Sequence, residues 1–202
     1  MKIKIGAGLI VAGLLAVIWS MGPREPAPAV SVIEEEPYRE VDWIELMPED
    51  DLQALMSPPD WMTDIVDGSD EDDLRLLSSP RADDSGEARF FEALESAEIV
   101  TAMDNTRIRI PGFIVPLAYD NRQRTIEFFL VPYFGACLHL PPPPPNQIIY
   151  VNYELGIDQH SMYEPVWVEG VLRAQPVSNA VANAAYRLNA SVITPYHDTS
   201  GY

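Results

Sequence analysis

The chain has very few of the residues on which catalysis and metal binding usually depend. Its 202 residues include one cysteine and three histidines. A lone cysteine excludes an internal disulfide, and so few histidines argue against a high-capacity zinc scavenger. The sequence also has no glycine-rich nucleotide-binding loop, no serine-hydrolase elbow and no His-x-x-x-His pair. Chemistry in this chain must therefore be sought at a small number of positions.

Basic residues are scarce as well. The chain has 13 Lys and Arg against 31 Asp and Glu, which gives a formal net charge of −18. Because nucleic-acid binding depends on neutralising phosphates, this composition argues against DNA or RNA as a partner. Many of the carboxylates lie in an acidic loop at residues 64–87. We interpret it as a solvated surface loop, with weak calcium or magnesium binding as the alternative.

Only one long hydrophobic run is present, at residues 5–21, and Lys2 and Lys4 precede it. A basic start, an apolar middle and a following Gly-Pro breaker are typical of an export signal. Residues 1–22 are therefore predicted to be a signal peptide or an N-terminal anchor in the inner membrane. The positive charge before the run favours export of the chain that comes after it. We expect the remainder to be periplasmic, either exported or anchored to the inner membrane by residues 5–21.

The rest of the chain divides into a tether and one folded domain. Residues 23–40 are rich in Pro and Glu without periodicity, which is typical of a linker. Residues 41–202 form the predicted domain, with the acidic loop inside it. Two short helices are expected in it, at residues 49–56, where Leu52, Leu55 and Met56 share one face, and at residues 87–97. The predicted strands cover residues 99–103, 108–117, 125–131, 147–153, 165–172 and 185–194, and one helical turn is expected at 178–183.

These short strands, rich in β-branched and aromatic residues, predict an all-β fold with short helices. Gly112 lies in the middle of a strand, where it permits a bend or bulge, and Pro116 indicates that this strand ends at an edge. A bent first strand followed by several short ones is typical of a small antiparallel OB-fold-like barrel.

The strongest candidate for a functional site is Cys137-Leu138-His139, which stands just before five consecutive prolines. On an extended strand, residues i and i+2 point to the same face, so the thiol and the imidazole would lie together. The prolines favour a stiff polyproline II segment beside them. Cys137 and His139 are therefore predicted to form half of a metal site, with zinc as the expected ion. A third ligand could be His160, His197, Asp198 or a residue from a second chain.

Several motifs together resemble one bacterial family, the envelope domain-of-unknown-function family 3299. They are RIPGFIVPL at 109–117, EFFLVPYFGACLHLPPPPPNQIIYV at 127–151 and PVWVEGVL at 165–172. The resemblance implies a secreted or membrane-anchored envelope protein. It also implies an association with an ABC transporter, through a permease or periplasmic subunit, and a link to zinc limitation.

The sequence therefore predicts a non-enzymatic envelope binding or accessory protein with a Cys-x-His zinc half-site. One alternative is a purely structural adaptor that docks a partner through an aromatic and polyproline face. The residues predicted for that face are Tyr133, Phe134, Pro141, Pro142, Pro143, Asn146 and Gln147. A second alternative is a cysteine-dependent enzyme, in which Cys137 is the nucleophile and His139 the base.

Overall fold

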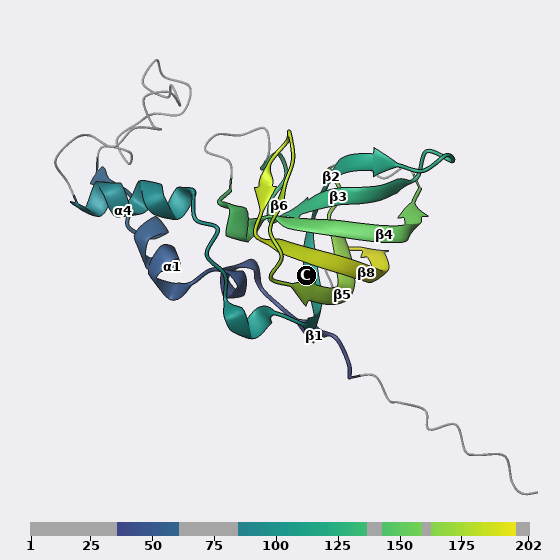
Figure 1. Cartoon of the computed structure of the whole chain (residues 1–202), viewed down its shortest axis with the longest axis horizontal. Helices are drawn as coiled ribbons and strands as arrows, with labels where there is room; N and C mark the ends of the chain where they lie inside the picture. Colours follow the sequence, from purple (N-terminus) through teal and green to yellow (C-terminus); the bar gives the residue numbers. More distant parts are fainter. Residues whose placement is uncertain (1–35, 61–84, 137–142, 159–162, 197–202) are drawn as a thin grey trace, which may run out of the picture. The chain divides into compact units, whose positions relative to one another are not determined.

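The computed structural model describes residues 36–60, 85–136, 143–158 and 163–196 (Figure 1). The chain divides into two compact units, residues 1–35 and residues 36–202, and all described residues belong to the second. The predicted signal or anchor at 1–22 lies outside the described residues, as does most of the acidic loop. None of the helices in the described ranges is long and apolar enough to cross a membrane.

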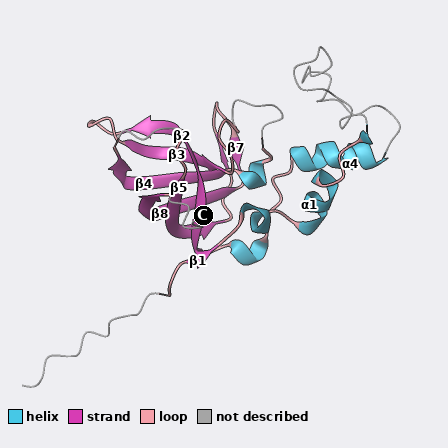
Figure 2. Ribbon diagram, turned by 180° about the vertical axis from the view of Figure 1, so that it is seen from behind, coloured by secondary structure: helices cyan, strands magenta, loops and turns pink. Residues whose placement is uncertain are grey.

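Five strands close into a barrel, as Figures 1 and 2 show. They are β2 (Thr106–Tyr119), β3 (Thr125–Val131), β4 (Ile149–Ile157), β5 (Val166–Arg173) and β8 (Tyr186–Pro195). The order around the barrel is β2-β3-β4-β8-β5, and a β2–β5 pairing closes it. This is the Greek-key connectivity of an OB-fold, so the predicted fold class is confirmed. One pair, β4 and β8, is parallel, so the barrel is not antiparallel throughout.

Strand β2 bends, and this allows it to pair with two barrel strands, β5 and β3. Its first half pairs with β5 as far as Gly112, and its second half pairs with β3 from Phe113 onward. A Cβ at Gly112 would meet the Leu130 side chain and the Val131 carbonyl oxygen at 2.8 Å, so the close approach of the two strands requires glycine. A bulge follows between Pro116 and Tyr119. In the described chain this second half pairs with β3 alone, which places Pro116 at the expected edge.

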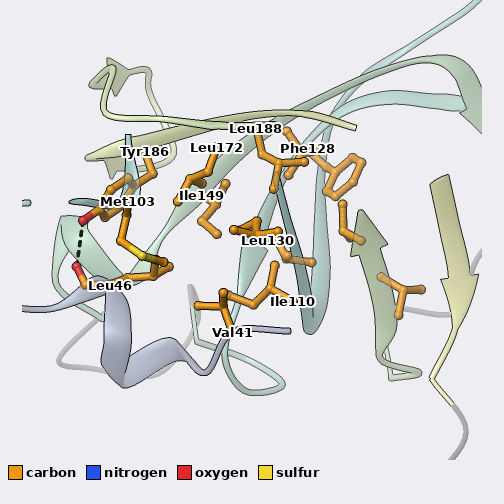
Figure 3. Packing of buried hydrophobic residues seen from close by; sticks show 14 of the residues in the cluster. Val41, Leu46, Met103, Ile110, Phe128, Leu130, Ile149, Leu172, Tyr186 and Leu188 are labelled. Carbon is orange, nitrogen blue, oxygen red and sulfur yellow. Dashed lines mark hydrogen bonds between the residues drawn. The ribbon is translucent and has the colours of Figure 1, made fainter. Parts of the chain in front are cut away.

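Alternate residues of every barrel strand point inward and form the main core (Figure 3). Its fully buried members include Ile108, Ile110, Phe128, Leu130, Ile149, Leu172, Tyr186 and Leu188. A second, smaller group packs against the outer face of β3. This outer cluster consists of the buried residues Phe129, Val131, Ala136, Ile148 and Ala184.

The two α-helices lie at one end of the barrel in both views (Figures 1 and 2). Helices α1 (Glu49–Leu55) and α4 (Ser85–Leu94) pack against each other. Two 3-10 turns flank the helical pair in the chain, η2 (Trp43–Leu46) before α1 and η3 (Thr101–Met103) after α4. A third, η4 (Pro145–Gln147), lies between β3 and β4. The short strand β1 (Arg39–Glu40) pairs in parallel with β2, so ordered structure begins within the predicted tether.

Two local predictions were wrong. Residues 99–103 form an irregular segment and η3 rather than a strand, because the Val100 amide bonds to the buried Tyr186 hydroxyl instead of to a neighbouring strand. Residues 178–183 are not a helical turn. They form the turn of a hairpin between β6 (Val177–Ser178) and β7 (Asn183–Ala184), where the Asn179 side chain accepts hydrogen bonds from two backbone amides.

Candidate functional site

The structure describes the two ends of the segment that contains the candidate site. Cys137 and His139 lie outside the described residues, and so do Pro141, Pro142, His160 and His197. The structure describes the residues on either side of this segment, Ala136 before it and Pro143 after it, and both are buried. The described part of the site therefore consists of its two boundaries.

The upstream boundary is a tight turn after β3. Gly135 adopts a φ of 77°, and the Ala136 amide donates to the Tyr133 carbonyl at 3.3 Å. This turn places Ala136 in the outer cluster with no exposed surface, while Tyr133 and Phe134 remain 45% and 38% exposed. The residue just before the candidate segment, Ala136, is therefore buried, and the two aromatic residues that precede it, Tyr133 and Phe134, are exposed.

Phe134 belongs to a group of aromatic rings on the outer surface. Its ring centroid lies 4.6 Å from that of Tyr163 and 6.2 Å from that of Phe113. Tyr163 is 69% exposed. We call Phe113, Phe134 and Tyr163 the aromatic patch. It joins β2, the turn after β3 and the segment before β5 next to the predicted site.

The downstream boundary is η4, which follows the prolines. Asn146 has no exposed surface, and its side-chain amide donates to Asp51 Oδ2 and to the Glu98 carbonyl, both at 3.2 Å. Its backbone amide donates to the Ser96 carbonyl at 3.3 Å. Asn146 Oδ1 is buried and has no hydrogen-bond partner among the described residues. These bonds tie the end of the proline run to the segment after α4 and to α1.

Gln147 makes the second attachment at this boundary. Its side-chain amide donates to the Trp43 carbonyl at 2.9 Å and to the Asn146 carbonyl at 3.2 Å. Pro143, Asn146 and Gln147 are among the residues predicted to contact a partner, but the structure buries all three. Their burial gives them a role inside the chain, where they fix the end of the segment. Tyr133 and Phe134 are the described residues of that prediction that a partner can reach.

Asp51 completes the downstream anchor, and no sequence pattern indicates its role. It is 1% exposed, and Arg89 Nη2 donates to its Oδ1 at 2.5 Å. Arg89 also bonds to Asp50 at 3.1 Å. The hydrogen bond to the Asp51 carboxylate raises the pKa of the Arg89 guanidinium above its usual value. In the sequence, Asp51 looks like an ordinary acidic residue in the first turn of a helix, and only the contact between α1 and Asn146 sets it apart.

Within the described ranges no group of three or more His, Cys, Asp or Glu residues could hold a metal ion. The predicted donors, Cys137 and His139, lie outside those ranges. A thiolate and an imidazole are two of the donor types that zinc prefers.

A closed five-stranded Greek-key barrel, extended by a helical pair, places the protein among the small OB-like β-barrel proteins. The family described as "Protein of unknown function (DUF3299)" matches residues 43–195. A crystal structure of a DUF3299 family protein from Pseudomonas aeruginosa PAO1 is 35% identical and has a TM-score of 0.59. The similarity covers 80% of this chain and 98% of that one. A comparison with curated proteins gave no match. The chain belongs to the DUF3299 family, which confirms the resemblance noted in its motifs.

Proposed function

We propose that this protein is an exported or membrane-anchored binding and accessory protein of the bacterial envelope. In this proposal it is not an enzyme, it works beside an ABC-type transporter, and it binds zinc through Cys137 and His139. The observation that carries the proposal is the anchoring of both ends of the segment that contains this pair. Ala136 is fully buried on one side, and Asn146 is fully buried on the other.

Fixed ends favour ligand capture because they reduce the conformational entropy that binding must remove. Ala136, which directly precedes Cys137 in the sequence, is a buried member of the outer cluster. A pair that supplies two ligands leaves positions open for a third ligand or for an exchange partner. Such a half-site suits transfer of zinc, or completion by another chain, better than permanent structural binding.

The envelope location is supported by the basic start and the apolar run at residues 5–21. The transporter association rests on what the family resemblance implies. Both parts of the proposal can be tested separately from zinc binding, because they concern where the chain resides and what it contacts.

Zinc titration of the purified chain, without a histidine tag, tests the metal proposal. We expect about one equivalent of zinc to bind, and binding to be lost in both Cys137→Ser and His139→Ala. Leu138→Ala is the matched control, because it changes the same segment without removing a ligand. The metal proposal fails if the wild-type chain takes up no zinc, or if the first two variants bind it as well as the control does.

Thiol labelling of Cys137 separates the two alternatives to a zinc site. Rapid labelling with a lowered thiol pKa and no zinc uptake would favour the cysteine-dependent enzyme. Labelling that requires unfolding would favour a structural role for the cysteine. Under the zinc proposal, we expect the folded protein to be labelled when metal-free and protected when zinc is added.

The adaptor remains a second candidate because the aromatic patch is exposed next to the anchored segment. Exposed aromatic side chains are enriched at protein interfaces. A photo-crosslinking amino acid at Phe134 should capture a transporter subunit in cells, identified by mass spectrometry. The same group at Leu155, which is 65% exposed on β4, is the control and should not capture it. Equal capture from both positions, or from neither, would remove the support for docking at this patch.

A further inference from the structure

Two arginines stand opposite each other on the outer face of the barrel. Arg173 is the last residue of β5, Arg187 is the second residue of β8, and the two are direct partners in this antiparallel pair. Their neighbours Leu172 and Leu188 point into the core, so both arginine side chains lie on the outer face. Like charges placed directly opposite each other on a sheet repel and destabilise the pair.

Neither arginine has an acidic partner in the described part of the chain. Four other described arginines, by contrast, form ion pairs: Arg39, Arg89, Arg109 and Arg124. The guanidinium of Arg187 instead lies 4.9 Å from the centroid of the Tyr150 ring, and its Nε is buried without an acceptor among the described residues. The chain has 31 acidic residues against 13 basic ones, so a shortage of carboxylates does not explain this arrangement.

The pair occupies a position that OB-folds use for ligands. Arg173 and Arg187 flank the connection between the fourth and fifth barrel strands, which runs through residues 174–185. In OB-folds this connection and the outer face of the middle strands form the usual binding surface. Tyr150 of β4 pairs with Arg187 and extends the site onto a middle strand. Near the pair, the Asp104 carboxylate accepts a hydrogen bond from the backbone amide of Ala174 rather than from the side chain of Arg173.

We propose that Arg173 and Arg187 form a binding site for the phosphate group of a ligand. Each guanidinium offers a planar fork of N–H donors that matches the oxygens of a phosphate. A doubly charged phosphate between them replaces their mutual repulsion with attraction. This site consists of other residues than the proposed zinc site, and its ligand is an anionic phosphate group rather than a metal ion.

Thermal unfolding of the full chain, in inorganic phosphate and in chloride at equal ionic strength, tests the site. We expect phosphate to raise the Tm of the wild-type protein, because a ligand that binds the folded state stabilises it. Arg173→Gln should lose this shift. Arg122→Gln is the matched control, since Arg122 is exposed in the β2–β3 turn and forms no ion pair with described residues, and this variant should keep the shift.

The same variants separate binding from a structural role. In chloride alone, Arg173→Gln should unfold at the same Tm as the wild type or higher, because it removes the repulsion from Arg187. A general stabilising effect of phosphate acts on all variants alike, so only the difference between Arg173→Gln and Arg122→Gln measures the site. The proposal is overturned if the two variants respond equally, or if Arg173→Gln unfolds at a lower Tm in chloride.

A second probe identifies the source of the phosphate group. Phosphatidylcholine vesicles with and without phosphatidic acid are sedimented with each variant. Retention that requires both phosphatidic acid and Arg173 would assign the site to a lipid headgroup. A Tm shift with inorganic phosphate but no retention would assign it to a soluble phosphorylated ligand. Absence of both responses in the wild-type chain would sink the proposal.

Discussion

At the scale of single residues, buried polar atoms hold the parts of the domain together. The Tyr186 side chain is fully buried in the main core, yet its hydroxyl makes two hydrogen bonds. It accepts from the Val100 amide at 2.8 Å and donates to the Leu46 carbonyl at 2.9 Å, the latter drawn in Figure 3. One side chain on the last strand therefore fixes two segments that precede the first barrel strand.

Removing this hydroxyl should destabilise the domain. In Tyr186→Phe, the Val100 amide and the buried Leu46 carbonyl both lose their hydrogen bond to the hydroxyl. We expect a loss of roughly 1–3 kcal/mol in the free energy of unfolding, measured by urea denaturation. The control Tyr119→Phe, at a residue 55% exposed, should change it by less than about 0.5 kcal/mol. Equal effects of the two substitutions would contradict the role assigned to the hydroxyl.

Tyr150 should make the free energy of unfolding decrease as the pH rises through the alkaline range. Burial, followed by the hydrogen bond to Glu127, raises the pKa of Tyr150 from 10.0 to about 12. The folded state therefore keeps this proton where the unfolded state has begun to lose it. The resulting stability is fully present below pH 10, falls between pH 10 and pH 12, and is lost above that range.

Comparison with Tyr150→Phe isolates this contribution. The free energy of unfolding, measured by denaturant titration across the alkaline range, should fall less steeply with pH in the variant than in the wild type. Tyr186, whose pKa is also raised by burial, is present in both proteins and cancels in the comparison. Parallel pH profiles would show that Tyr150 ionises alike in both states.

At the scale of elements, the helical pair supports the candidate segment. Helix α1 lies where the sequence predicts a helix, but it buries different residues from those predicted. Met56 of the expected apolar face is 75% exposed, whereas Asp51 is buried. Asp51 faces Asn146 on η4, and Arg89 of α4 pairs with the same carboxylate. The two helices therefore hold the end of the proline run through a charged and hydrogen-bonded contact.

Breaking this contact should loosen the segment that contains Cys137. Asn146→Ala leaves Asp51 Oδ2 and the Glu98 carbonyl without a donor, which should cost roughly 1–3 kcal/mol in the free energy of unfolding. Asp51→Ala combined with Asn146→Ala should cost less than the sum of the single changes, because the two residues share one contact. Thiol labelling of Cys137 should also be faster in Asn146→Ala than in the control Gln53→Ala. Additive costs and unchanged labelling would contradict this coupling.

Local patterns in the sequence predicted the barrel strands well and their surroundings less well. The prediction for residues 125–131 coincides with β3, because alternation and β-branched residues are local signals. Residues 99–103 are similarly apolar, but Val100 bonds to Tyr186, which lies 86 positions away. The roles of Asn146 and Gln147 likewise depend on Asp51 and Trp43, which a local pattern cannot identify. The motif alone could not tell which of its residues are buried anchors and which are exposed, because that distinction depends on the fold.

At the scale of the whole molecule, the OB-like fold is one that often binds nucleic acid, whereas the negative net charge disfavours such a ligand. OB-fold barrels commonly bind oligonucleotides on the face formed by their middle strands. In this chain, part of that face is filled by the outer cluster, in which Phe129 and Val131 are fully buried. The formal net charge of −18 adds a repulsive field around the barrel. Arg173 and Arg187 form a small positive area within that field, sufficient for one phosphate group but not for a polynucleotide backbone.

The chain should therefore not bind nucleic acid despite its fold. Fluorescence anisotropy of a labelled single-stranded oligonucleotide should show no saturable change at physiological salt, because too few cations are available to release counterions from the backbone. Lowering the salt concentration should not reveal binding, since weaker screening also strengthens the repulsion from the acidic surface. A saturable signal that weakens steeply with added salt, and that Arg173→Gln abolishes, would contradict this expectation. That result would extend the arginine site from a single phosphate to a nucleic-acid surface.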